Sequence, residues 1–334
     1  MALRIGVLGT GAIGTDHATM LATTIGGASV AAVFDVDIAR AGELAHRIGA
    51  RRHEAATGLI NDADVDAVVI ASPGTAHAEQ VLACIAAGKP VLCEKPLAST
   101  VDDAARVVAA EAALGRRLVQ VGFMRRFDPG YVAVKDTIAA DRIGTPMIVH
   151  CVHRNRSVPA GFTNAMAMTD TMVHEIDIVR WLLDDEIVSV RVVRGRRGPH
   201  AVEGHDDPQL VLMTTASGVL AEVEVILLWP PGYDVRCEVV GSDGLATLEH
   251  PRVVSTTMTG NRSEVVPDGW KTRFGDTYRI ELQAWVAATL AGTVVGASAW
   301  DGYAATVVAH AAAAAQGAAD EVGVRLIARP PLYG

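Results

Sequence analysis

The stretch Ala165–Leu182, AMAMTDTMVHEIDIVRWL, combines an apolar helical stripe with ionisable side chains. At α-helical spacing Asp170, His174 and Asp177 fall at i, i+4 and i+7, on one side of the helix. A histidine has a reference pKa near 6.5 and can accept a proton at neutral pH. A carboxylate one turn earlier can orient the imidazole. The residues alone also fit a structural interpretation, in which Asp170 caps the helix and its pairing with His174 lies on the surface.

A candidate cation follows an apolar strand in the run Gly88–Pro96, GKPVLCEKP. Lys95 stands at the carboxyl end of the strand, immediately before a proline. A doubly wound sheet presents its ligand crevice at that end of its strands. Lys95 is therefore a candidate functional residue, and the alternative is a solvated loop lysine.

The segment Gly9–Gly14, GTGAIG, matches the G-x-G-x-x-G pattern. It follows a predicted strand and opens a predicted helix, which is the context of a dinucleotide-binding loop. Gly9 permits the tight turn, Gly11 lets the backbone approach a pyrophosphate, and Gly14 allows close helix–strand packing. The free amides and the positive end of the helix dipole would receive the phosphates.

An acidic residue, Asp35, ends the next predicted strand. Its carboxylate can accept hydrogen bonds from ribose hydroxyls and would repel a 2′-phosphate. Val36 and Asp37 follow, so we expect no adjacent cation to hold that phosphate. The sequence therefore predicts NAD as the cofactor rather than NADP.

The first third of the chain alternates short apolar runs with helical patterns, as in a βαβ series. Predicted strands are 3–8, 30–34, 65–71 and 90–93, and predicted helices are 14–24, 38–48, 76–87 and a segment between Thr100 and Gly115. The near-continuous apolar strands indicate a parallel sheet that is covered on both faces. We predict an α/β fold whose residues 1–122 form a dinucleotide-binding Rossmann domain with a doubly wound parallel sheet.

After Gly122 the pattern changes to successive strands with little helix between them. The candidates are 147–152, 188–193, 209–214, 219–228 and 235–240. They predict an α+β domain over residues 123–334, built on a large, open, mostly antiparallel sheet for substrate binding and oligomerisation. The helix that carries Asp170 would lie on one face, and a second subunit would cover the other.

Composition excludes several classes of protein. Half of the 334 residues are hydrophobic, a fifth are charged, and the formal net charge is −9, which argues against nucleic acid or an anionic membrane as a partner. The least charged stretch, 282–300, is too interrupted for a membrane span. Neither a signal peptide nor a metal site is predicted, and the four dispersed cysteines fit reduced, buried thiols. We expect a cytoplasmic protein.

Together these residues resemble a known family. GTGAIG, AGKPVLCEKP, GFMRRFDPGY and DTMVHEID are similar to motifs of the family that includes glucose–fructose oxidoreductase and inositol dehydrogenase. The resemblance covers nearly the whole chain. VHCVHRN, MTDTMVHEIDIVRWLL, GYDVRCEVVG and SAWDGYAA most resemble its bacterial inositol-oxidising branch. This implies NAD-dependent oxidation of myo-inositol to 2-keto-myo-inositol by a cytoplasmic homotetramer assembled through the second-domain sheets.

The resemblance implies that Lys95, Asp170 and His174 are the catalytic residues. Oxidising a secondary alcohol requires loss of the hydroxyl proton while hydride leaves the same carbon for the nicotinamide. His174 can take that proton, and Asp170 can orient the ring and stabilise its protonated form. Lys95 can hold the developing negative charge on the substrate oxygen.

Matching positions imply two sets of ligand contacts. Cofactor contacts are implied for Gly9, Gly11, Ala12, Ile13, Gly14, Asp35, Ser72, Pro73, His77, Glu94 and Lys95. Substrate contacts are implied for Arg125, His153, Asn155, Thr171, Asp177, Tyr233 and Tyr278, which offer many donors and acceptors to a ring of hydroxyls. The structural alternatives are a His153 satisfied within the sheet, an Arg125 paired with an acid and a Tyr278 packed in the core. The family's common asparagine after the Ser-Pro pair is replaced by Gly74.

Three other functions fit the same residues. The chain could oxidise a different cyclic polyol or pyranose, such as scyllo-inositol or a glucose-like sugar. It could use bound NAD for redox-assisted glycoside cleavage, or it could be a non-catalytic NAD-binding regulator. Turnover with a panel of polyols distinguishes these alternatives.

Overall fold

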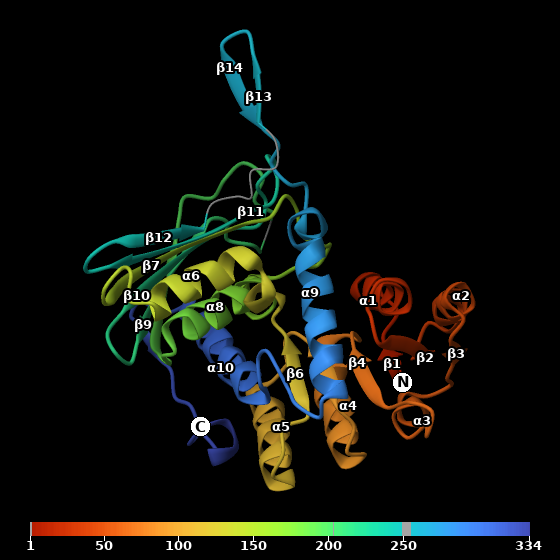
Figure 1. Ribbon diagram of the computed structural model, residues 1–334. Helices are drawn as coiled ribbons and strands as arrows, with labels where there is room; N and C mark the ends of the chain where they lie inside the picture. The colour runs from red at the N-terminus through yellow and green to blue at the C-terminus, as the bar shows by residue number, and fades with distance from the viewer. Residues whose placement is uncertain (1, 203, 249–254) are drawn as a thin grey trace. The chain divides into compact units, whose positions relative to one another are not determined.

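The computed structural model describes residues 2–202, 204–248 and 255–334, which form two compact units (Figure 1). The first comprises Met1–Phe127, Asp276–Thr306 and Leu326–Gly334, and the second comprises Asp128–Gly275 and Val307–Arg325. This division differs from the single boundary predicted after residue 122. Two of its later boundaries fall inside the helices α9 (Trp270–Leu290) and α10 (Ala299–Ala315), where helical periodicity continues without a break. The sequence pattern therefore offers no signal of the change of unit.

The first unit is built on a six-stranded parallel sheet, as predicted. Its strands are β1 (Leu3–Leu8), β2 (Ala28–Phe34), β3 (Arg51–Arg52), β4 (Ala67–Ile70), β5 (Val91–Glu94) and β6 (Val119–Gly122). They lie in the order β3-β2-β1-β4-β5-β6. The connecting helices are α1 (Ala12–Thr23), α2 (Ile38–Ile48), α3 (Ala56–Ile60), α4 (Gly74–Ala86) and α5 (Val101–Leu114), with a 3-10 turn η1 (Met124–Phe127) after β6. This strand order is that of a Rossmann fold.

The core of this unit brings together side chains from distant parts of the sequence. Ile5 and Val7 of β1 belong to one buried apolar cluster with Leu21 of α1, Leu44 of α2 and Trp285 of α9. The strands are buried along almost their whole length, which explains their near-continuous apolar sequence. The sheet is therefore covered partly by α9, which begins more than two hundred residues after the end of α2.

Capping residues mark the ends of two helices in this unit. The side chain of Thr100 accepts a hydrogen bond from the amide of Asp103 at the start of α5, and Gly115 ends that helix with φ of +73°. The helix predicted over 38–48 has those same bounds. Its N-cap, Asp37, accepts a hydrogen bond from the amide of Arg40.

The C-terminus is held by a buried carboxylate. The hydroxyl of Tyr333 donates to Glu111 Oε2 at 2.6 Å, and Oε1 of the same residue accepts the amides of Leu118 and Val119 at 2.5 and 2.6 Å. Burial, followed by the hydrogen bond to Glu111, raises the pKa of Tyr333. The last residues of the chain are therefore part of the first unit's fold.

We expect Tyr333→Phe to lower the free energy of unfolding by about 1–3 kcal/mol, because Glu111 Oε2 loses its donor inside the fold. Urea denaturation of the full chain, followed by circular dichroism, measures the change. An unchanged denaturation midpoint would show that the hydroxyl contributes nothing to stability.

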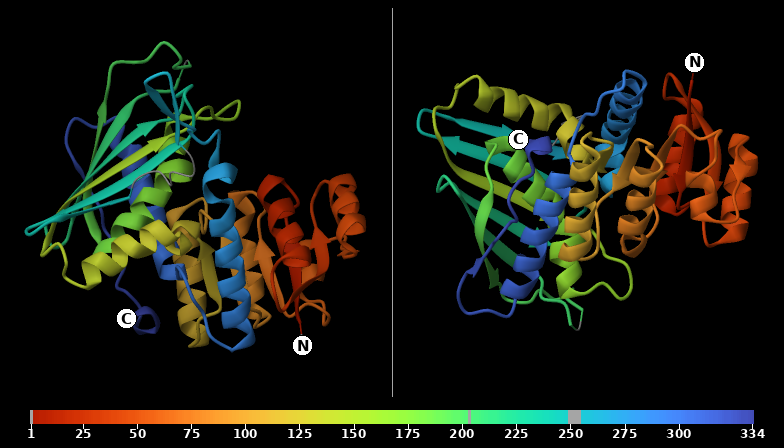
Figure 2. Two further views of the ribbon diagram at one scale, coloured as in Figure 1. Left: turned by 45° about the horizontal axis from the view of Figure 1, so that its top comes forward. Right: turned by 90° about the horizontal axis from the view of Figure 1, so that it is seen from below.

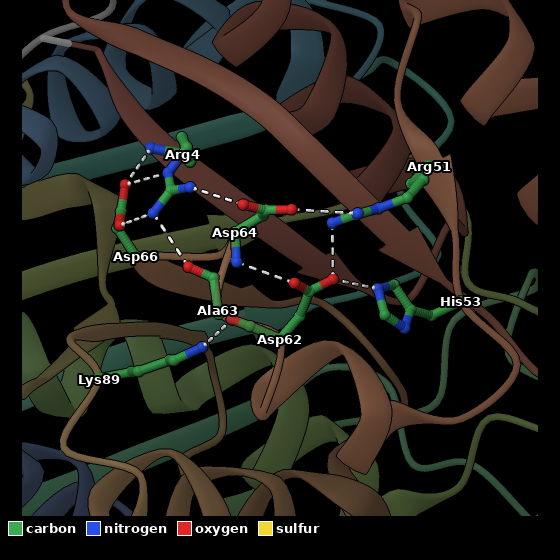
Figure 3. Close-up of polar contacts among 8 residues, drawn as sticks. All are labelled: Arg4, Arg51, His53, Asp62, Ala63, Asp64, Asp66 and Lys89. Carbon is green, nitrogen blue, oxygen red and sulfur yellow. Dashed lines mark hydrogen bonds and ion pairs between the residues drawn. The ribbon is translucent and has the colours of Figure 1, made fainter.

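Charged side chains form a network at the opposite end of the strands from the predicted ligand crevice (Figure 3). Arg4 Nη2 lies 2.7 Å from Asp66 Oδ1, and Arg51 Nη2 lies 2.6 Å from Asp62 Oδ2. His53 contacts the same Asp62 oxygen at 2.8 Å. The network joins β1 and β3 to the loop before β4 and gives this edge of the sheet a structural role.

The pKa of Asp66 lies below its usual value, chiefly because of the hydrogen bond from Arg4. A carboxyl group with a lowered folded-state pKa adds stability above its unfolded pKa, and that stability is lost as pH falls through the folded value. We expect Arg4→Gln to lower Tm near neutral pH, with a difference from the unmodified protein that shrinks as pH falls below about 4. Thermal melts from pH 7 to pH 3 test this, and a constant difference would contradict it.

The second unit contains the large sheet that was predicted to be mostly antiparallel (Figure 2). Its strands are β7 (Pro146–Arg154), β8 (Ile187–Arg194), β9 (Gln209–Thr215), β10 (Leu220–Ile226), β11 (Asp234–Gly241), β12 (Leu245–Leu248) and β15 (Val322–Gly323), in the order β12-β11-β7-β10-β9-β8-β15. Strands β7 and β10 pair in parallel, and the other pairs described are antiparallel. The expectation of a mostly antiparallel sheet is confirmed.

Helices cover one face of this sheet. The helices α6 (Pro129–Ala139) and α8 (Val173–Leu183) lie on it (Figures 1 and 2). The short α7 (Asn164–Met166) and the π-helical turn η2 (Ala167–Met172) directly precede α8. The hairpin of β13 (Ser255–Met258) and β14 (Asn261–Glu264) is a separate two-stranded sheet, and the short turn η3 (Pro331–Tyr333) belongs to the first unit. Along the described residues no helix is long and apolar enough to span a bilayer.

Candidate active site

The turn between β1 and α1 has the shape that a dinucleotide requires. Gly9 has φ of +91°, and a Cβ there would lie 2.5 Å from the backbone of Ala71. A Cβ on Gly14 would lie 2.0 Å from the carbonyl oxygen of Gly9, so only glycine fits at either position. A Cβ on Gly11 would meet nothing within 4 Å, and no side chain caps α1. These observations fit a pyrophosphate at the start of α1, beside Ala12 and Ile13.

Asp35 is buried beside this turn and holds it in place. Its Oδ2 accepts the amide of Thr10 at 2.6 Å and the Thr10 hydroxyl at 3.0 Å. Its Oδ1 accepts the amide of Asp37 at 2.9 Å and Arg40 Nη2 at 2.8 Å. Burial opposes ionisation, but these hydrogen bonds together hold the pKa of Asp35 below its usual value. The residue is therefore a carboxylate at neutral pH.

The contact with Arg40 contradicts one step of the sequence argument. No cation was expected near Asp35, and that expectation is wrong, because Arg40 lies in the first turn of α2. The Asp37 cap starts the helix at residue 38 and turns the chain back toward Asp35. The side chain of Arg40 is about half exposed. A carboxylate and a guanidinium thus lie side by side after β2, at the position where a Rossmann fold binds the ribose of a dinucleotide.

The predicted cofactor residue His77 is buried between two loops of the first unit. Its Nδ1 lies 2.7 Å from the carbonyl oxygen of Pro96, and its Nε2 lies 2.7 Å from that of Ser72. Burial lowers the pKa of His77. Ser72 also contacts Gln80 through its hydroxyl, and Pro73 precedes α4 as its N-cap. This placement favours a role for His77 in joining the loops after β4 and β5.

The strand β5 ends at the buried Glu94, and the half-buried Lys95 follows it. Glu94 Oε1 lies 2.7 Å from Nε2 of His17, a fully buried residue of α1. Glu94 Oε2 accepts the amide of Lys95 at 3.3 Å. The ring of His17 also lies 5.6 Å from that of Tyr278. The structure thus groups Tyr278 and Glu94 through a histidine that the sequence argument missed.

Arg125 is the remaining predicted site residue of the first unit. It lies in η1, directly after β6, and is 1% exposed. A guanidinium at this depth is stable only when its charge is paired or hydrogen-bonded. Its burial agrees with the alternative weighed for it, a pairing with an acid, as well as with a role in the site.

The candidate general base lies on a helix that is buried on every side. All residues from Thr171 to Arg180 are buried, including His174, Glu175 and Asp177, whereas Asp170 is half-buried. The spacing of Asp170 and His174 was interpreted as that of a single α-helix, but the segment contains two kinds of helix. Asp170 lies in the π-helical η2 and His174 in α8. A π turn closes i→i+5 hydrogen bonds, so the i, i+4 rule does not apply unchanged to this pair.

Three predicted substrate residues of the second unit lie together. His153 on β7 has Nε2 at 3.2 Å from Asn155 Oδ1, and its ring meets that of Tyr233 edge-on at 5.9 Å. Two backbone hydrogen bonds hold Asn155, one to Ile226 and one from Trp229. His153 Nδ1 lies 2.8 Å from Oε1 of Glu175, which the sequence argument missed. Glu175 directly follows His174 in the sequence. No local sequence pattern indicates that its partner is His153, which lies 22 residues earlier on β7.

Comparison with known proteins identifies the family of the chain. Residues 3–123 match the family model described as "Oxidoreductase family, NAD-binding Rossmann fold", and residues 131–247 match "GFO/IDH/MocA C-terminal domain". The chain is 49% identical to "Inositol 2-dehydrogenase 3" of Saccharopolyspora erythraea, covering 100% of this chain and 99% of the relative. It is 48% identical to "Inositol 2-dehydrogenase" of Paracoccus denitrificans over 100% of both chains.

Solved structures give the same result. The myo-inositol dehydrogenase of Lactobacillus casei, in complex with NAD(H) and myo-inositol, superposes with a TM-score of 0.97 at 36% identity over 100% of both chains. The scyllo-inositol dehydrogenase of the same organism, with NAD(H) and scyllo-inositol, superposes with a TM-score of 0.89 at 26% identity over 97% and 99%. The chain belongs to the GFO/IDH/MocA family of NAD-binding oxidoreductases.

Proposed function

We propose that this chain oxidises myo-inositol to 2-keto-myo-inositol with NAD. The observation that carries the proposal is the polar group of the buried His153 and Tyr233 with the half-buried Asn155, in the same unit as the helix of His174. A substrate that is hydroxylated around its whole ring needs such a surface of donors and acceptors. Full-length identity of 46–49% to inositol 2-dehydrogenases supports the same substrate.

Three side chains would perform the proton chemistry. The hydroxyl O–H bond breaks, and His174 takes the proton as general base. Asp170 orients the imidazole and stabilises its charge, and Lys95 stabilises the negative charge that develops on the substrate oxygen. When bound, NAD supplies the hydride acceptor, so that the C–H electron pair leaves carbon as the C=O bond forms.

The other proposed contacts select the substrate. Arg125, Thr171, Asp177 and Tyr278 would join the His153 group in hydrogen-bonding the ring hydroxyls. A site built to bond a hydroxyl rejects an analogue that lacks it, because the buried partner is then left unpaired. We therefore assign specificity among inositol isomers to these residues and chemistry to the catalytic three.

Assembly as a homotetramer through the second-unit sheet is part of the proposal. The sheet face opposite α8 carries polar pairs such as His150 with Glu222 at 2.8 Å, together with the exposed leucines Leu212, Leu220 and Leu245. Apolar side chains around a central polar ladder suit a face that packs on a second copy. Light scattering on the purified chain measures the subunit number, and a monomer would contradict this part.

The function itself is tested by initial rates of NADH formation with myo-inositol, scyllo-inositol, other inositol isomers and glucose, each with NAD and NADP. We expect the highest kcat/KM for myo-inositol with NAD. A higher value for scyllo-inositol or glucose would assign the chain to another polyol. NAD binding without turnover of any polyol would contradict the enzyme proposal, and sugar release without net NAD reduction would indicate glycoside cleavage.

A further inference from the structure

Glu175 is a buried carboxylate that the mechanism above does not use. It is 1% exposed and follows His174 on α8. Its Oε1 lies 2.8 Å from Nδ1 of His153, which is itself 2% exposed. Burying a carboxylate is costly unless it is paired, so this contact between α8 and β7 is a strong constraint on both side chains.

The contact determines which nitrogen of His153 carries a proton. An ionised carboxylate only accepts hydrogen bonds, so Nδ1 must be the donor. A neutral imidazole then has its lone pair on Nε2, which lies 3.2 Å from Oδ1 of Asn155. An amide oxygen cannot donate to that lone pair, so this tautomer requires the Asn155 amide to turn its NH2 group toward Nε2. The ring therefore offers one defined nitrogen to the group formed with Asn155 and Tyr233.

The same contact fixes the direction of the ring. His153 pairs with Val235 of β11 across the sheet, and its ring meets Tyr233 edge-on at 83°. A rotation of the imidazole about its Cβ–Cγ bond would break the contact with Glu175 and change the contacts with Asn155 and Tyr233. Glu175 thus acts on all three residues through one hydrogen bond.

We propose that Glu175 is a positioning residue for substrate recognition: it holds His153 as the Nδ1-protonated ring with Nε2 toward Asn155, in the one orientation that lets these two side chains contact the polyol together. The proposal rests on the proposed function, because it needs His153 as a substrate contact. It assigns Glu175 no role in proton transfer from the reacting hydroxyl.

Glu175→Gln tests this with a side chain of the same shape. A neutral amide can face Nδ1 with either its oxygen or its nitrogen, so the charge-assisted hydrogen bond and the defined tautomer are lost together. We expect KM for myo-inositol to rise about tenfold while kcat changes about twofold or less, because a hydrogen bond to a charged group is stronger than a neutral one. Affinity for NAD should not change.

A double-mutant cycle separates this role from a merely structural one. His153→Gln should raise KM by itself, and adding Glu175→Gln to it should raise KM no further, because Glu175 acts through His153. Glu186→Gln is the matched control. Glu186 Oε2 accepts a hydrogen bond from Arg180 of the same helix at 2.6 Å, so its loss perturbs α8 without touching His153. Its KM should remain that of the unmodified protein.

Glu175→Asp is the second variant, for the case in which the glutamine variant does not fold. It keeps the charge but shortens the side chain, so the contact with His153 Nδ1 is lost and KM should rise by the same factor. Independent, additive effects of the two substitutions, or an unchanged KM in a folded Glu175 variant, would overturn the inference while leaving the proposed function standing. Failure of the unmodified protein to oxidise myo-inositol would overturn the proposed function instead, and with it the need for a positioned His153.

Discussion

His174→Ala should reduce kcat for myo-inositol oxidation by a factor of roughly 10²–10⁴, which is the usual contribution of a positioned general base. Without the imidazole the hydroxyl proton has no acceptor of suitable pKa when hydride leaves the carbon. The residues proposed to hold NAD belong to the first unit and His174 belongs to the second, so affinity for NAD should stay nearly unchanged. Initial rates give kcat, and fluorescence titration gives the affinity for NAD.

His200→Ala is the matched control for this prediction. His200 is also a histidine of the second unit, but it is exposed in the loop between β8 and β9. Its removal should leave kcat within about twofold, since it contacts neither ligand. Retention of most turnover by a folded His174→Ala protein would end the general-base assignment.

Asp35→Ser should lower the ratio of kcat/KM with NAD to kcat/KM with NADP by a factor of roughly 10²–10³. This is the expected effect of losing one or two hydrogen bonds to a charged group. The carboxylate would no longer bond the ribose hydroxyls or repel a 2′-phosphate. The substitution also removes one of two carboxylates that pair with Arg40: Asp35 Oδ1 lies 2.8 Å from Nη2, and Asp37 Oδ2 stays 3.3 Å from Nη1. The Nη2 side of the guanidinium is then available to bind a phosphate. Binding of NADP and kcat/KM with each cofactor measure the change.

The double variant Asp35→Ser with Arg40→Gln shows which of the two residues acts. If Arg40 receives the 2′-phosphate, the double variant should lose most of the gain in NADP affinity while keeping the weakened affinity for NAD. Equal NADP binding by the single and double variants would leave Arg40 without that role. A preference for NADP in the unmodified protein would contradict the account of Asp35 altogether.

Much of the fold could be predicted from the sequence because local signals and tertiary packing agree. The strand 3–8, the helix 38–48 and the helix between Thr100 and Gly115 have the expected bounds. The change from continuous apolar strands to alternating ones predicted the change from a parallel to a mostly antiparallel sheet. Each strand or helix buries a fixed face, so the spacing of its apolar residues predicts the type of element and the side that is buried.

Side-chain partners distant in sequence could not be predicted in the same way. His17 and Glu94 are 77 residues apart, and His153 and Glu175 are 22 apart on different elements. Only the folded sheet and its helices bring these atoms within 3 Å. Arg40 was missed although it is five residues from Asp35, because its position depends on the first turn of a helix rather than on adjacency.

The π-helical turn at Asp170 and the division of the later helices show a second limit. The spacing of Asp170 and His174 was interpreted with α-helical geometry, but the backbone between Ala167 and Met172 follows another repeat. Likewise α9 and α10 each belong to both units, although their sequence periodicity is uninterrupted. These features depend on what each helix packs against, which the local pattern does not encode.

The most direct test of the central claim is a crystal structure of the chain with NADH and myo-inositol, a complex that holds both ligands without turnover. We predict that Lys95 Nζ and one ring nitrogen of His174 each lie within about 3.2 Å of the same hydroxyl oxygen. The account would be contradicted by a complex in which these two nitrogen atoms contact different hydroxyls. It would equally be contradicted if Lys95 Nζ or the His174 imidazole pointed away from the inositol.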